Sequence, residues 1–122
     1  MSQIPNSKQN QYDLEERTFQ FTKRVNEYVN KLVKTIPNIE NGRQLVRSAG
    51  SVGANYIEAN ESLSKKDFVM RIKICRKEAK ESRYWLKLSE TNEKECKKEK
   101  EALIQEATEL MKIFGSILEK SK

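Results

Sequence analysis

Apolar residues recur along most of this chain at intervals of three and four positions, the spacing that places them on one face of an α-helix. The pattern runs through four successive segments and predicts helices at 13–36, 41–62, 64–91 and 94–120. The average repeat of about 3.5 residues is typical of helices packed roughly 20° apart in a bundle. Because the connections are short, neighbouring helices should run antiparallel. The expected fold class is all-α, an antiparallel up-down four-helix bundle.

Polar and helix-breaking residues indicate where these helices begin and end. Asp13 and Ser64 each stand three residues before an acidic side chain, the spacing of an N-terminal cap. Pro37 is expected to close the first helix, because proline cannot continue a helix interior. The polar residues 1–12 come before the pattern starts. The sequence therefore predicts a disordered N-terminal lead at 1–12, followed by one bundle domain at 13–122.

Two glycines lie inside the predicted second helix. Gly50 and Gly53 each cost roughly 1 kcal/mol there relative to alanine. Such a cost suggests a place where two helices approach closely. The pair does not match a phosphate-binding loop, because its spacing fits neither GxGxxG nor a Walker motif and it lies within a helix.

Composition excludes several kinds of chemistry. The chain contains no histidine, so it lacks the usual general base and the commonest metal ligand. The Glu-x-x-His pairs of di-metal bundles therefore cannot form. Cys75 falls on the predicted core stripe and forms no CxxC pair with Cys96, so two reduced thiols are expected and a zinc site is not. We predict no enzyme activity, no cofactor and no metal.

The expected compartment and the net charge narrow the range of expected partners. No apolar run approaches the roughly 18 residues that a membrane span needs, and residues 1–11 lack the apolar core of a signal peptide. A cytoplasmic protein with no membrane partner is expected. The net charge of +6 favours an acidic partner such as nucleic acid, although many soluble proteins carry as much.

The predicted third helix carries a band of positive charge that contains no acidic residue. At about 100° per residue, eight basic side chains fall within an arc of roughly 120°, outside the core stripe: Lys65, Lys66, Lys73, Arg76, Lys77, Lys80, Arg83 and Lys87. We call this set the basic stripe. It is ~33 Å long, enough to follow several phosphates. It indicates nucleic-acid contact or, alternatively, a solvated face, although such a face usually mixes charges of both signs.

Two further stripes suggest contact between subunits. The third helix mixes large apolar and charged side chains beside its core stripe, as interface cores and rims do: Arg71, Ile74, Glu78, Glu81, Trp85 and Leu88. The alternative is that Trp85 simply widens the bundle core. One face of the second helix is polar: Arg47, Ser51, Asn55, Glu58 and Ser62. That face fits a hydrogen-bonded subunit contact or an ordinary exposed surface.

With these residues in view, the chain resembles the bacterial four-helix-bundle proteins of the large-subunit ribosomal RNA intervening-sequence family. The resemblance covers most of the chain and is most specific in residues 45–68 (LVRSAGSVGANYIEANESLSKKDF) and 72–86 (IKICRKEAKESRYWL). Many members keep a proline in the second helix where this chain has Val52-Gly53-Ala54. That difference places the chain in a branch whose role is poorly defined.

The family is similar in fold to the accessory variability proteins of retroelements, which form barrel-like homopentamers, bind nucleic acid and associate with a reverse transcriptase. The resemblance therefore implies a homo-oligomer, with a pentamer expected, and no enzyme activity. It implies an accessory or adaptor associated with RNA or DNA without sequence preference, and a reverse transcriptase or other protein as a partner. The alternative is a homo-oligomeric protein-interaction scaffold that binds no nucleic acid. The two differ in whether the basic stripe stays exposed after assembly.

Overall fold

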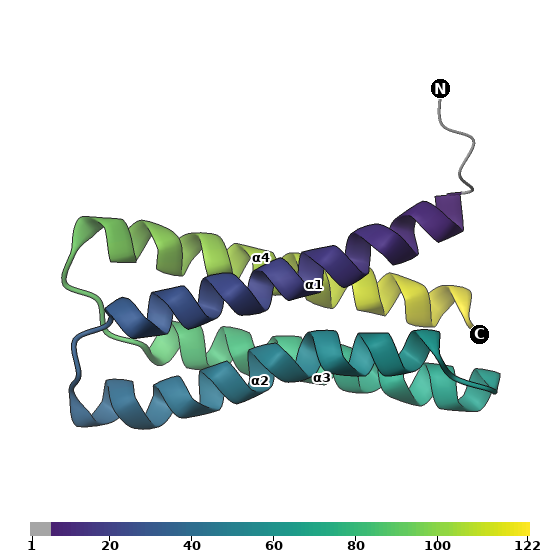
Figure 1. Cartoon of the computed structure of the whole chain (residues 1–122), viewed down its shortest axis with the longest axis horizontal. Coiled ribbons are helices and arrows are strands. Elements are labelled where there is room, and N and C mark those ends of the chain that lie inside the picture. Colours follow the sequence, from purple (N-terminus) through teal and green to yellow (C-terminus); the bar gives the residue numbers. More distant parts are fainter. Residues whose placement is uncertain (1–5) are drawn as a thin grey trace.

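Four long helices make up nearly all of the structure. A computed structural model describes the backbone of residues 6–122 and the side chains from Leu14 onward. The helices are α1 (Asn6–Lys31), α2 (Ile36–Asn60), α3 (Lys65–Leu88) and α4 (Lys94–Lys120). They run up and down in turn (Figure 1), with α1 and α3 each packed between α2 and α4. The described residues contain no strand, so the predicted all-α antiparallel bundle is confirmed.

Pro37 begins the second helix rather than ending the first. α1 ends at Lys31 and α2 begins at Ile36, so the proline lies in the first turn, where a helix needs no N–H donor. The backbone N of Asn38 donates to Oγ1 of Thr35 at 3.1 Å, which caps this earlier start. The predictions that the first helix reaches residue 36 and that the second begins at residue 41 were therefore wrong.

The remaining boundaries follow the local sequence. α1 begins at Asn6, not at the predicted Asp13, because no glycine or proline interrupts residues 6–13. Residues 1–5 of the predicted lead lie outside the described residues. Ser64 caps α3 as predicted, with its Oγ accepting from the backbone N of Asp67 at 3.1 Å. α4 has the predicted bounds.

The core is built from one buried stripe on each helix, as the periodicity predicts. Its fully buried members include Phe21, Val25, Tyr28, Leu45, Ala49, Val52, Ile72, Cys75, Ala79, Leu86, Leu103, Ala107, Leu110 and Phe114. Alanine at the middle of α2, α3 and α4 leaves room for close helix packing. Buried hydroxyls find partners across helices, since Oγ of Ser48 and Oγ of Ser82 lie 2.9 Å apart between α2 and α3.

The two glycines of α2 differ. A Cβ placed on Gly53 would lie 3.2 Å from Oγ1 of Thr18 on α1, so the predicted close approach is confirmed there. Gly50 has no atom within 4 Å of such a Cβ, so no helix of the same subunit approaches it closely and the residue faces open space. Gly42, which the pattern did not single out, is close to α1 because its Cβ would lie 3.2 Å from Cγ1 of Val29.

Candidate nucleic-acid interface and subunit contacts

The basic stripe lies on the outer face of α3. Seven of its eight side chains are exposed, and Arg83 is half-buried. In the part of the chain that the structure describes, no member of the stripe forms an ion pair. The positive charge of α3 is therefore available to an anion from solvent.

The two arginines of the stripe lean toward α4. Arg83 donates from Nη1 to Oγ1 of Thr108 at 3.2 Å. Nη1 of Arg76 lies 3.8 Å from the point that a Cβ on Gly115 would occupy. Both arginines thus lie over small residues of α4, whereas the lysines of the stripe have no such contact among the described residues. A ligand would meet positioned arginines along one edge of the stripe and exposed lysines along the rest.

The two ends of the stripe differ in charge. Near the start of α3, a shallow hollow is lined by Lys65, Lys66, Val69, Met70 and Lys73, with no acidic residue. Near the end of α3, the hollow beside Lys87 also contains Lys97, Lys100, Glu90 and Glu101. The surroundings of the stripe are therefore more strongly positive at its start than at its end.

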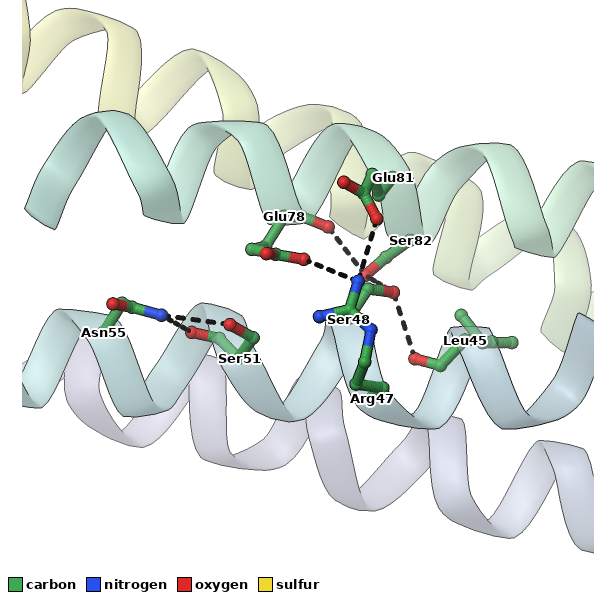
Figure 2. A network of polar contacts seen from close by, with 8 residues as sticks. All are labelled: Leu45, Arg47, Ser48, Ser51, Asn55, Glu78, Glu81 and Ser82. Carbon is green, nitrogen blue, oxygen red and sulfur yellow. Dashed lines mark hydrogen bonds and ion pairs between the residues drawn. The ribbon is translucent and has the colours of Figure 1, made fainter.

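The predicted interface residues of α2 and α3 form a network within the subunit. Figure 2 shows Glu78 and Glu81 of α3 both directed at Arg47 of α2. Nη2 of Arg47 donates to Oε1 of Glu78 at 3.2 Å and to Oε1 of Glu81 at 2.9 Å. Glu78 is only 6% exposed, so its carboxylate depends on this guanidinium for compensation.

A second polar group lies one turn further along α2. Nδ2 of Asn55 donates to the backbone O of Ser51 at 2.9 Å and to its Oγ at 3.0 Å (Figure 2). Oδ1 of Asn55 accepts from Nη1 of Arg71 at 2.8 Å, which ties α2 to α3. Glu58 is exposed on the same face. Part of the polar stripe thus holds the two helices of one subunit together.

Trp85 lies partly inside the bundle. It is half-buried and packs against the core, and its Nε1 is buried with no hydrogen-bond partner among the described residues. Ile74 is also half-buried, whereas Leu88 is exposed. The interpretation that Trp85 widens the core therefore has direct support, and the surface left for a neighbouring subunit on this flank centres on Ile74 and Leu88.

Sequence reasoning missed an exposed apolar line on α2. It consists of Ile39, Val46, Gly50 and Ile57, which share one side of the helix, and we call it the α2 apolar edge. Val46 is 39% exposed and Ile57 is 53% exposed. An apolar groove between α1 and α2 continues the edge and includes Val29, Val33, Ile39, Gly42 and Val46. The signal was present in the sequence as β-branched residues beside, but outside, the core positions.

The thiol of Cys75 is buried within the bundle. Sγ of Cys75 donates to the backbone O of Val52 at 3.4 Å, and burial raises the pKa of this thiol to about 12. At neutral pH the thiol is protonated and a poor nucleophile. From Leu14 to Lys122, no three His, Cys, Asp or Glu side chains are grouped so that they could hold a metal ion. None of the described helices is both long and apolar enough to cross a membrane.

Comparison with known proteins agrees with this architecture. The model of the family described as 23S rRNA-intervening sequence protein matches residues 10–116. The chain is also similar to a protein of unknown function from the S23 ribosomal protein family of Bacteroides thetaiotaomicron, known from a crystal structure at 1.70 Å resolution. The two are 32% identical, with a TM-score of 0.70 over 85% of this chain and 96% of the other. No curated protein matches the sequence.

Proposed function

The chain belongs to the 23S rRNA-intervening sequence protein family, and we propose that it is a non-enzymatic, oligomeric bundle protein that associates with nucleic acid. It acts as an accessory or adaptor, with a reverse transcriptase or another protein as a partner. The observation that carries this proposal is the basic stripe, whose lysines are exposed and unpaired among the described residues.

Lysines along a helix face recognise the phosphate backbone rather than the bases. Each phosphate that they neutralise releases counterions, which supplies binding energy without sequence preference. Affinity should therefore fall with log salt by about 0.9 per phosphate contacted on duplex DNA and about 0.7 on a single strand. This behaviour distinguishes phosphate contact from base recognition.

Self-association strengthens the binding of phosphates by the basic stripe. We expect a homo-oligomer, with a pentamer as the leading candidate, because repeated basic stripes add their weak contacts by multivalency. We assign the subunit contact to the outer face of α2, where the α2 apolar edge adjoins Arg47, Ser51, Asn55 and Glu58. The occupant of that face is a second copy of the chain.

The size of this face supports a subunit contact. From Ile39 to Ile57 it is ~27 Å long, and a width of about one helix diameter gives on the order of 300 Å². A standard interface uses about 800 Å² per partner, so the apolar edge and its polar border are both needed. The α3 flank at Ile74 and Leu88 can supply the remainder. The basic stripe lies further round the bundle and stays exposed in such an assembly.

The test compares two variants with equal net charge. In the first, Lys73, Lys77, Lys80 and Lys87 of the stripe are replaced by Gln. In the second, Lys23, Lys31, Lys34 and Arg43, which are exposed on α1, α2 and their connection, are replaced by Gln. The stripe variant should bind structured RNA and duplex DNA at least a hundredfold more weakly at low salt, with a shallower salt dependence. The matched variant should lose much less of its affinity for structured RNA and duplex DNA.

Two results would contradict the proposal. Equal losses in the two variants would mean that net charge, not the stripe, attracts nucleic acid. No shift of structured RNA or duplex DNA by the wild-type protein at low salt would leave the protein-interaction scaffold as the function. Light scattering that returned a single-subunit mass at micromolar concentration would exclude the oligomer in either case.

A further inference from the structure

One aromatic side chain stands within the basic stripe. Tyr84 lies at the same angle around α3 as Lys66, within about 20° of Lys73 and Lys77, at about 100° per residue. It is 57% exposed, although an aromatic ring gains by burial. Its position therefore presents a flat apolar surface among cations.

The ring of Tyr84 is supported from within the bundle. It meets the ring of Trp85 edge-on, with centroids 4.9 Å apart and planes 75° apart. Trp85 itself packs against the core. Because its neighbour is anchored, Tyr84 has less freedom to lose when it contacts a ligand, which lowers the entropic cost of binding.

Two lysines flank this ring along the helix. Lys80 precedes Tyr84 by four residues and Lys87 follows it by three, so both are its surface neighbours, with Cβ atoms about 5–6 Å away. Their own separation along the axis is ~10.5 Å. The acidic neighbour, Glu81, is bound to Arg47 on α2 at 2.9 Å, which reduces its charge but does not cancel it, because Arg47 also pairs with Glu78. The arrangement is a ring with an unpaired cation before it and another after it.

We propose that Tyr84 is a stacking site for an unpaired base and that the basic stripe therefore prefers single-stranded nucleic acid to duplex. In a duplex the bases stack on one another and offer Tyr84 no face, whereas an unpaired base can lie on the ring. The phosphates on either side of that nucleotide then reach Lys80 and Lys87. This inference rests on the proposed nucleic-acid association and names the form of nucleic acid that the site takes.

The experiment uses the full chain and its one tryptophan as the reporter. Because the rings of Tyr84 and Trp85 are in contact, a base stacked on Tyr84 should quench Trp85 fluorescence. Oligouridylate, oligothymidylate and a GC-rich RNA duplex with the same number of phosphates are titrated at low salt. Variants Tyr84→Leu and Tyr84→Phe are compared with the wild-type protein, with light scattering and circular dichroism as checks of assembly and fold.

The expected result is tighter binding and stronger quenching by the single strands than by the duplex. Tyr84→Leu should weaken single-strand binding about 5- to 150-fold, the range for loss of one base–aromatic stack. It should leave duplex binding unchanged, and Tyr84→Phe should retain the wild-type preference. Binding by one single strand and not the other shows that the site distinguishes the two strands by the sugar or by the methyl group of thymine, and keeps the inference.

The inference and the proposed function can fail separately. Equal affinity for single strand and duplex, with no effect of Tyr84→Leu, would overturn the stacking site and leave phosphate binding by the stripe intact. Binding to neither probe at low salt would overturn both.

Discussion

α2 and α3 pack together through similar inner faces but expose opposite outer ones. Inside, small and weakly polar groups meet, as at Ser48 with Ser82 and at Cys75 with the backbone O of Val52. Outside, α2 exposes Val46 and Ile57, whereas the matching face of α3 is occupied by lysines.

This difference separates what the fold requires from what function requires. Four buried stripes are enough to specify a bundle, and they place no demand on the outer faces. An apolar outer face costs solubility unless a partner covers it, and a face of like charges costs mutual repulsion unless an anion neutralises it. The two outer faces are therefore the basis of the two proposed partners, a second subunit for α2 and a polyanion for α3.

The largest expected effect comes from charging the apolar face. Val46→Glu with Ile57→Glu would bury two unpaired carboxylates in the proposed subunit contact, at a cost of several kcal/mol. We expect at least a hundredfold weaker assembly, seen by light scattering as a shift to single-subunit mass with helix content unchanged. Lys73→Glu with Lys80→Glu on α3 is the control, which should keep the mass and lose nucleic-acid binding. An unchanged mass in the α2 variant would move the contact to Ile74 and Leu88.

The shared inner face should make the bundle sensitive to alkali. The thiol of Cys75 has a pKa of about 12 in the fold and ionises near 9.0 when unfolded, because burial disfavours the thiolate. The contribution of the buried, protonated thiol to the free energy of unfolding is complete below the unfolded pKa. It is lost as the pH rises from 9.0 toward about 12. The free energy of unfolding should then fall by on the order of 1 kcal/mol per pH unit.

Urea unfolding at several pH values checks this decline. Cys75→Ala should be less stable at neutral pH because of the cavity, but its stability should fall less steeply above pH 9. Burial also raises the pKa of Tyr28 and Tyr56, so some decline in the same direction should remain. A Cys75→Ala variant with the wild-type slope would count against the buried thiol as the cause.

Substitution of Gly53 tests how closely the inner face of α2 packs against α1. Oγ1 of Thr18, which a new side chain would meet at 3.2 Å, is itself held by a 2.9 Å hydrogen bond to the backbone O of Leu14. Gly53→Val should therefore lower the free energy of unfolding by about 1–3 kcal/mol, the usual cost of overpacking. Thermal unfolding measures it, and a variant as stable as wild type would show that Thr18 can move aside.

Substitution of Gly50 by alanine tests the outer face of the same helix, and it has the smallest expected effect. Open space surrounds a Cβ placed there, and alanine favours a helix by up to about 1 kcal/mol over glycine. Gly50→Ala should thus raise the melting temperature of the subunit by a few degrees. If it also lowers the mass of the assembly, a neighbouring subunit approaches α2 closely at this point. A destabilised variant of unchanged mass would contradict the open environment of Gly50.

The sequence predicts the parts of the fold that depend on local chemistry. The four buried stripes, the Ser64 cap and the bounds of α4 are correct because periodicity and capping act over a few residues. The role of Pro37 was misjudged because the residue suits both the end of one helix and the first turn of the next. The Thr35 cap, which accepts from the backbone N of Asn38, decides for the first turn of α2.

The candidate sites depend on geometry that one helix cannot reveal. A helical wheel of each helix by itself shows no partner for Arg47, Glu78 and Glu81, but the crossing of α2 and α3 joins them within one subunit. The exposure of Gly50 and the packing of Gly53 likewise depend on where α1 lies. By contrast, the exposure of the basic stripe was predictable, because it lies outside the core stripe of its own helix.

An even number of antiparallel helices returns the chain to the end of the bundle where it started. The start of α1, the α2–α3 connection and the C-terminus lie together at that end (Figure 1), where Leu63 is fully exposed. A circular permutant that links Lys122 to the start of α1 and opens the chain at residues 61–64 would keep every helix contact. It would place the α3–α4 hairpin first and the α1–α2 hairpin second, so that each hairpin, with its own outer chemistry, could be exchanged as a cassette between members of the family.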